Sequence, residues 1–287
     1  MKLALGTAQF GLNYGVANTL GKIPHNSAEE IIKYCRSAGI NILDTAISYG
    51  ESEKCLGSIG VQDFNIVTKL PDIPDAISDI ESWMMEEVSS SISRLNTKSL
   101  YGLMLHRPNQ LFERNGEAIV ASLKKLKDMG VIEKVGVSVY SPDEFKDLFL
   151  MHDFDLVQCP FNLIDRRLVS SGWLKKLKNS GVEVHVRSAF LQGLLLMPRN
   201  KIPQKFEAWS SLWDFWHAWL AENAVSPIKA CLAYVLSESN IDQIIVGVDS
   251  KEQLQQITGA IETTCLDAFP DISSLDNRLL NPSNWKT

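Results

Sequence analysis

Short apolar runs alternate along the chain with segments whose apolar residues recur at helical spacing. Several of the short runs are apolar throughout, as expected for strands that are covered on both faces of a sheet. Eight runs fit this description in a chain of 287 residues. They are Leu3–Thr7, Ile40–Thr45, Asn65–Lys69, Leu100–His106, Lys134–Val139, Phe154–Cys159, Val182–Ser188 and Gln243–Val248.

The segments between these runs predict helices, and three of them end at a glycine just before the next strand. Glycine accepts the left-handed backbone that closes a last helical turn. Strand, helix and strand repeated in this way predict a single-domain (β/α)8 barrel rather than an open doubly wound sheet. No Gly-x-Gly-x-x-Gly follows an early strand, which argues against a Rossmann fold. Helical examples are Ser27–Ser37, Ile80–Ile92, Ala118–Lys127 and Leu168–Lys178, and the glycines are Gly39, Gly130 and Gly181.

The interval at about 189–242 is longer than one helix requires and predicts an insertion. Its four tryptophans are spaced so that they share one helical face. Packing against the barrel or a subunit interface is favoured over an aromatic wall for substrate. A second helix, Ile228–Leu236, is predicted after Pro227, and a C-terminal tail after about residue 263. The tryptophans are Trp209, Trp213, Trp216 and Trp219.

Composition narrows the function classes. The net charge is −6, without a basic run, which argues against nucleic-acid or membrane-surface partners. No run approaches a membrane span, and the first residues turn polar too soon for a signal peptide. The five cysteines form no Cys-x-x-Cys pair, so no metal or redox site is expected. A reduced, cytoplasmic enzyme is the expectation.

Four ionisable residues follow three consecutive strand runs, where barrel enzymes place their chemistry. These are Asp44, Tyr49, Lys69 and His106. A lone aspartate here is more often a helix cap, but four such groups at one rim indicate a site. Asp44 can pair with Lys69, and an ammonium beside a phenol lowers the phenol pKa. The set predicts proton transfer without a metal, and a nicotinamide cofactor as the source of electrons.

Several motifs occur in order along the chain, namely Leu5–Gly11, Asp44–Gly50, Thr68–Lys69, Leu105–Pro108, Lys127–Ser138, Gln158–Asn162 and Gly193–Leu195. Together they resemble the aldo-keto reductase family over nearly the whole chain. Its catalytic tetrad then falls on Asp44, Tyr49, Lys69 and His106, in agreement with the strand-end argument. The resemblance also implies a cofactor site made of Gly6, Thr7, Asp44, Ser138, Gln158, Arg187, Ser188, Leu191, Gly193, Gly247, Val248, Asp249, Gln253 and Gln256.

Several positions depart from what the family often has, including Gln256–Ile257 in place of a Glu-Asn pair that contacts the adenine. Val139 replaces an asparagine that would bind the nicotinamide carboxamide. Arg187 replaces an aromatic ring that stacks on the nicotinamide, and its charge would disfavour the oxidised, positively charged ring. Asp249 stands where a basic residue often holds the 2′-phosphate, and it could accept a hydrogen bond from a free ribose hydroxyl instead. Lys251 could compensate, so NADP and NAD are about equally supported.

The expected function is reduction of an aldehyde or ketone to an alcohol by hydride transfer from NAD(P)H, with Tyr49 as proton donor. The alternative is a cofactor-binding, redox-sensing or regulatory subunit with slow reductase activity, which could use the tryptophan face as an interface. A metal-dependent hydrolase has little support, because only His106 among the histidines ends a strand cleanly. Polar residues at Asn13–Gly15 and Asn18 hint at a sugar-like substrate. Whether the chain forms a homo-oligomer stays open.

Overall fold

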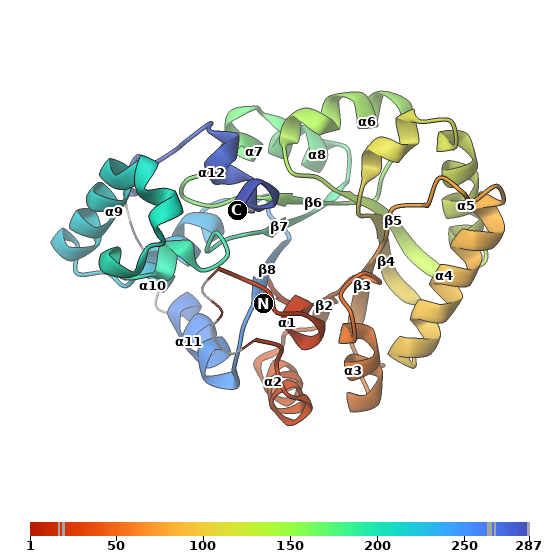
Figure 1. Cartoon of the computed structure of the whole chain (residues 1–287), viewed down its shortest axis with the longest axis horizontal. Helices are drawn as coiled ribbons and strands as arrows, with labels where there is room; N and C mark the ends of the chain where they lie inside the picture. Colours follow the sequence, from red (N-terminus) through yellow and green to blue (C-terminus); the bar gives the residue numbers. More distant parts are fainter. Residues whose placement is uncertain (17, 19–20, 263–265, 267, 286–287) are drawn as a thin grey trace.

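Parallel strands close into one barrel in sequence order, from β1 to β8 (Figure 1). The computed structural model describes residues 1–16, 18, 21–262, 266 and 268–285. The predicted (β/α)8 barrel is confirmed, and every predicted strand is found within two residues of its expected ends. The strands are β1 (Leu3–Gly6), β2 (Ile42–Asp44), β3 (Asn65–Leu70), β4 (Leu100–Leu105), β5 (Ile132–Ser138), β6 (Leu156–Pro160), β7 (Glu183–Arg187) and β8 (Gln243–Gly247).

The helices cover the outside of the barrel. Gly39, Gly130 and Gly181 follow helices at φ values of 71°, 69° and 75°, so the predicted left-handed ends are confirmed. The predicted continuous helix over 168–178 is wrong, because Gly172 at φ 78° breaks it into two. The helices are α1 (Ala8–Gly11), α2 (His25–Ala38), α3 (Ser52–Ile59), α4 (Ile80–Leu95), α5 (Gly116–Asp128), α6 (Phe145–Met151), α7 (Arg167–Ser170), α8 (Trp173–Asn179), α9 (Ser210–Glu222), α10 (Pro227–Leu236), α11 (Lys251–Glu262) and α12 (Asn277–Leu280).

The long connection between β7 and β8 carries α9 and α10, which lie on the left-hand side of the barrel in Figure 1. Trp213 and Trp216 of α9 are fully buried. Their indole nitrogens donate to the Phe206 carbonyl at 3.0 Å and the Leu195 carbonyl at 3.1 Å. These two rings therefore pack into the chain's own core, as favoured from the sequence. The expectation that Trp209 shares the helix is wrong. Three short 3-10 helices precede α9, namely η3 (Leu194–Leu196), η4 (Arg199–Lys201) and η5 (Gln204–Trp209).

The barrel interior changes from apolar to polar toward the end opposite the strand C-termini. Its middle is filled by one apolar layer. Between that layer and the N-terminal ends of the strands, Lys134 forms an ion pair with Glu183, and His185 Nε2 lies 2.6 Å from Glu183 Oε1. Burial alone would raise the pKa of Glu183, but hydrogen bonds from His185, Lys134 and Tyr101 outweigh it and lower the pKa to about 2. The apolar layer is Ala4, Ile42, Val67, Met104, Leu156 and Ile245.

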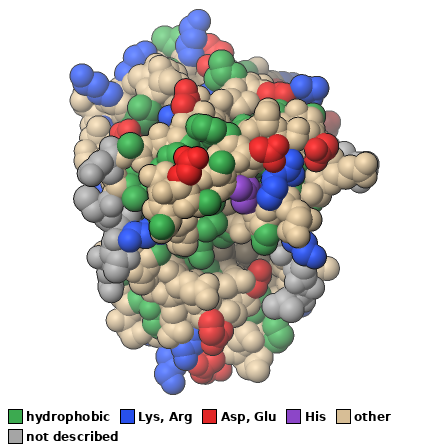
Figure 2. Space-filling view, turned by 90° about the vertical axis from the view of Figure 1, so that its left-hand side faces the viewer, with side chains coloured by type: hydrophobic (Ala, Val, Ile, Leu, Met, Phe, Trp, Pro, Cys, Tyr) green, Lys and Arg blue, Asp and Glu red, His purple; other side chains and the backbone are tan. Residues whose placement is uncertain are grey.

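The surface over α9 and α10 carries acidic and basic side chains interspersed with hydrophobic ones (Figure 2). Within the described residues, no helix is long and apolar enough to cross a membrane. The same residues contain no group of three or more His, Cys, Asp or Glu side chains that could hold a metal ion. The start of the predicted C-terminal tail, at 263–265 and 267, lies outside the described residues; beyond it, α12 is helical.

Candidate active site

A cavity of about 820 Å³ opens at the rim formed by the C-terminal ends of the strands. Strand register explains why residues far apart in sequence meet there, since Gly6 pairs with both Asp44 and Gly247. Of the residues predicted to bind the cofactor or react, those that line the cavity are Gly6, Thr7, Asp44, Tyr49, Gln158, Arg187, Ser188, Gly193, Gly247, Asp249, Gln253 and Gln256.

Asp44 and Lys69 form a buried ion pair at the base of this cavity. Lys69 Nζ lies 2.7 Å from one carboxylate oxygen and also donates to the Thr45 carbonyl at 2.9 Å. The other carboxylate oxygen accepts from Gln158 Nε2 at 2.7 Å. Burial lowers the pKa of Lys69, and the Asp44 carboxylate opposes that fall. The predicted pairing of Asp44 with Lys69 is confirmed, and Gln158 joins it from across the barrel.

Tyr49 and His106 lie next to this pair. Lys69 Nζ is 5.4 Å from the centroid of the Tyr49 ring, and the Tyr49 and His106 rings meet edge to face at 6.0 Å between centroids. The structure therefore brings together the four side chains singled out from the sequence. His106 directly follows β4, and its Nδ1 lies 3.4 Å from Ser48 Oγ.

The predicted fall in the Tyr49 pKa is wrong. Burial raises the pKa of Tyr49, the Asp44 charge raises it further, and only Arg187 opposes this. The Lys69 ammonium is engaged by a carboxylate, so it does not act on the phenol as a free charge would. Tyr49 therefore keeps its proton at neutral pH. Burial, followed by the charges of Lys69 and Arg187, lowers the pKa of His106 to about 4, so its imidazole is neutral there.

Close backbone packing fixes the turn that carries Tyr49. A Cβ atom on Gly11 would lie 1.8 Å from the Tyr49 carbonyl oxygen, so only glycine allows α1 to approach this closely. The same carbonyl accepts from the Ser52 backbone N–H at 3.0 Å. Ser52 Oγ in turn donates to the Thr7 carbonyl at 2.9 Å. The turn is thus held between α1, α3 and the end of β1.

Arg187 reaches into the same region from the end of β7. Its Nη2 donates to the Val139 carbonyl at 3.0 Å, and its guanidinium carbon lies 4.7 Å from the centroid of the Tyr140 ring. Among the described residues, no carboxylate forms an ion pair with Arg187. The guanidinium is half-buried and lines the cavity.

The loop after β7 has an unusual backbone conformation. Ser188, Leu191 and Gln192 have φ values of 63°, 48° and 52°, a conformation that non-glycine residues rarely adopt. Gly193 continues the run at φ 88°. Left-handed residues in a turn direct backbone N–H groups to one side, as in phosphate-binding loops. In this loop the N–H groups of Leu191 and Gly193 donate to the Ser188 and Phe190 carbonyls, so a diphosphate would have to be held by the N–H groups that remain.

The opposite end of the cavity fits a ribose. Asp249 Oδ1 is buried and has no hydrogen-bond partner in the described part of the chain. The Asp249 backbone N–H donates to Gln253 Oε1 at 2.8 Å, which fixes the loop after β8. Lys251 faces away to Glu30 of α2, at 3.2 Å. An unpartnered carboxylate oxygen accepts a hydroxyl donor such as that of a ribose.

Five of the predicted residues do not line the cavity. Lys69 and His106 lie beside it, next to Tyr49. The side chains of Ser138, Leu191 and Val248 are buried. For Leu191 and Val248, which belong to the apolar core, any contact with a cofactor would be made by the backbone.

Tyr140 lies at the site but was not predicted from the sequence. Its ring packs on the Arg187 guanidinium. Its place two residues beyond Ser138, at the end of a predicted strand, is the signal that could have found it. Tyr14, predicted only as part of a polar loop, lines the cavity and accepts from Gln192 Nε2 at 3.3 Å.

Comparisons with known proteins bear on the fold and the family. The model of the "Aldo/keto reductase family" matches residues 2–274. An uncharacterized oxidoreductase, YqkF of Bacillus subtilis, is 27% identical over 80% of this chain and 81% of its own length. An NADH-specific methylglyoxal reductase of Escherichia coli K12 is 23% identical over 93% and 91%.

Among solved structures, the holo form of the aldo-keto reductase AKR11C1 from Bacillus halodurans has a TM-score of 0.72 and 21% identity. It covers 92% of this chain, and 88% of its own length is matched. At 21% identity, this structural similarity supports the fold alone. The family match, however, extends over nearly the whole sequence, and the chain belongs to the aldo/keto reductase family. It is therefore an oxidoreductase that uses a nicotinamide cofactor and acts on small carbonyl compounds.

Proposed function

We propose that the protein reduces an aldehyde or ketone to an alcohol, with Tyr49 as the proton donor. The observation that carries this proposal is the convergence of Tyr49, His106 and the Lys69–Asp44 pair beside one cavity. The carbonyl is reduced while the cofactor is oxidised by two electrons. A bound reduced nicotinamide supplies the hydride to the carbonyl carbon.

The residues around the carbonyl protonate and orient its oxygen. Tyr49 is protonated at neutral pH because burial and the Asp44 charge raise its pKa, so its hydroxyl donates the proton to the carbonyl oxygen. His106 is neutral because burial and the Lys69 charge lower its pKa to about 4. A neutral imidazole N–H can hydrogen-bond the same oxygen and orient it toward Tyr49. Lys69, held by Asp44, keeps a positive charge close to the ring.

The residues that would hold the cofactor fit it in three places. Arg187 and Gln158 flank the nicotinamide end, the remaining N–H groups of the 188–193 loop would hold the diphosphate, and Asp249 suits the adenosine ribose. Gln253 and Gln256 lie beside Asp249 for the adenine. The sugar-like substrate remains a prediction from the polar loop around Tyr14.

The proposal is tested by mixing enzyme and reduced cofactor with a panel of aldehydes and ketones in a stopped-flow instrument. At least one carbonyl compound is expected to accelerate loss of the reduced-cofactor absorbance over the rate without substrate. If none does, the regulatory alternative is favoured. That alternative has lost some of its support, because Trp213 and Trp216 are buried in the chain itself and not exposed as an interface.

NADH is the proposed cofactor in preference to NADPH. Asp249 would repel a 2′-phosphate, and Lys251, which could have compensated, is paired with Glu30. The similar reductase of Escherichia coli is described as NADH-specific. Titration of both cofactors by quenching of protein fluorescence should show NADH binding about tenfold tighter or more, since like charges placed together cost several kcal/mol.

A matched pair of variants completes this test. Asp249→Asn removes the negative charge at the adenosine ribose and should reduce the difference in affinity between NADH and NADPH. Asp153→Asn removes an exposed carboxylate before β6 and should leave the difference in affinity between NADH and NADPH unchanged. A clear preference of the unmodified protein for NADPH would contradict the role given to Asp249.

A further inference from the structure

Arg187 lines the reacting end of the cavity as a cation that no carboxylate of the described residues pairs with; the exposed Lys201 lines the same cavity. Lys69 and Asp44 form a pair with no net charge. Burial and neighbouring cations lower the pKa of His106 to about 4, so this residue is neutral near pH 7. Tyr49 keeps its proton because burial raises its pKa. The positive charge of the Arg187 guanidinium is therefore not cancelled by these neighbouring groups.

Arg187 lines the cavity together with Asp44 and Tyr49, so its charge acts on the groups at the reacting end. Arg187 shifts the pKa values of Tyr49, His106, Lys69 and Tyr14. These side chains come from four different segments, and two of them, Tyr14 and Tyr49, line the cavity together with Arg187. A half-buried cation without an anion has lost part of its hydration and gains little in return. An incoming anion would recover that loss.

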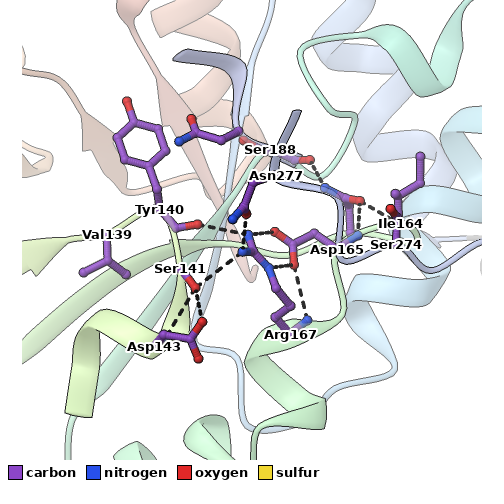
Figure 3. A network of polar contacts seen from close by, with 12 residues as sticks. Val139, Tyr140, Ser141, Asp143, Ile164, Asp165, Arg167, Ser188, Ser274 and Asn277 are labelled. Carbon is purple, nitrogen blue, oxygen red and sulfur yellow. Dashed lines mark hydrogen bonds and ion pairs between the residues drawn. The ribbon is translucent and has the colours of Figure 1, made fainter. Parts of the chain in front are cut away.

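Arg187 is also held in place, which favours binding of a charged group. Its platform is the Tyr140 ring and the Val139 carbonyl. Figure 3 shows how this platform is fixed, because the Tyr140 carbonyl accepts from Arg167 Nη2 at 3.1 Å. Arg167 is itself paired with the buried Asp165 at 2.8 Å.

The same network reaches the C-terminal segment. Arg167 Nη1 donates to Asn277 Oδ1 at 3.0 Å, so α12 is tied to the loop that carries Tyr140 (Figure 3). Asn162 Nδ2 donates to the Ser188 carbonyl at 3.0 Å, next to Arg187 in the chain. The guanidinium therefore rests on parts that are fixed before a ligand arrives, and little ordering is required on binding.

We propose that the physiological substrate is a carbonyl compound that carries a carboxylate or phosphate group, and that Arg187 binds this group. The inference rests on the proposed reductase function and adds the charge class of the substrate. Carboxylate and phosphate share the chemistry that a guanidinium recognises, namely two oxygens placed for parallel N–H donors. Arg187 is thus the residue that selects substrates by charge.

The test compares kcat/KM within two matched pairs of substrates. One pair is 4-oxobutanoate and butanal, which differ by the carboxylate. The other is glyceraldehyde 3-phosphate and glyceraldehyde, which differ by the phosphate. The charged member of at least one pair should be preferred by about tenfold or more, the usual worth of a hydrogen bond to a charged group. The pair with the larger preference identifies the anion.

Variants of Arg187 assign the preference to its charge. Arg187→Met should abolish the preference, mainly by raising KM for the charged member, and Arg187→Lys should retain part of it. Lys124→Met removes an exposed cation from the outer face of α5 and should leave the preference unchanged. A thermal melt of each variant checks that the fold is intact.

Three outcomes would overturn the inference. The first is equal use of both members of each pair by the unmodified protein. The second is an equal fall in kcat/KM for both members of each pair in Arg187→Met. The third is a change confined to the relative affinities for oxidised and reduced cofactor, which would mean that Arg187 acts on the nicotinamide.

A binding measurement separates this inference from the proposed function. Calorimetry of the protein with oxidised cofactor should show 4-hydroxybutanoate binding more tightly than 1-butanol, whether or not turnover occurs. The absence of such a preference would overturn the proposed charge class of the substrate. If neutral aldehydes are reduced and charged ones are not, the reductase function stands and the inference fails. If no carbonyl compound is reduced, the reductase function itself fails.

Discussion

Tyr49→Phe is expected to reduce turnover by about a hundredfold to ten-thousandfold, the usual contribution of a positioned proton donor. The loss follows because the phenol is the protonated group next to His106 and the Lys69–Asp44 pair. Affinity for the reduced cofactor should stay nearly unchanged, since Phe keeps the ring and removes one hydroxyl. Single-turnover kinetics on the best substrate and fluorescence titration of the cofactor provide the two readouts.

Tyr34→Phe is the matched control for that experiment. Tyr34 also loses a hydroxyl, whose partner is Thr258 Oγ1 at 2.7 Å, on the outer side of the barrel between α2 and α11. Turnover in this variant should equal that of the unmodified protein. A Tyr49→Phe protein that keeps most of its rate would show that another group supplies the proton.

Lys69→Met is expected to destabilise the fold by about 3–5 kcal/mol, because it leaves the Asp44 carboxylate buried without its cation. Both side chains are almost fully buried, at 1% and 5% exposure, so water would replace the lost partner poorly. Urea unfolding followed by circular dichroism measures the change. Turnover should be lost as well, since the cation beside the Tyr49 ring is removed.

Two further variants separate stability from chemistry at this pair. Adding Asp44→Asn to Lys69→Met removes the uncompensated charge and should recover much of the stability, but not the turnover. Lys125→Met breaks the exposed pair with Glu81 and should cost less than about 1 kcal/mol, as surface ion pairs do. An unfolding midpoint of Lys69→Met equal to that of the unmodified protein would contradict the role of the buried pair.

The sequence predicted the barrel well because its signal is local and repeated. Apolar runs that are covered on both faces, and glycines that end helices, identify strands and helix ends without knowledge of the partners. Asp44, Lys69 and His106 were found together for the same reason, since parallel strands present their C-terminal ends at one rim. The broken helix at Gly172 was missed because its apolar spacing continues across the break.

The electrostatics of the site could not be predicted in the same way. The sequence places a cation near Tyr49, which suggests a lowered pKa, but it does not reveal that Asp44 and Thr45 occupy the Lys69 ammonium. Nor does it reveal how far the phenol is withdrawn from water. Burial and competing partners depend on the whole fold, and here they reverse the direction of the shift in pKa.

The pairing of β1 with β8 has a consequence for how the protein folds. Gly6 and Gly247 are neighbours across this seam, and both line the cavity. They come from opposite ends of the chain, so the seam is the contact of greatest sequence separation in the barrel, and such contacts form slowly. The binding site is therefore completed by the same event that closes the barrel. A cofactor that binds only the closed form would hold the two ends of the chain together and should slow unfolding.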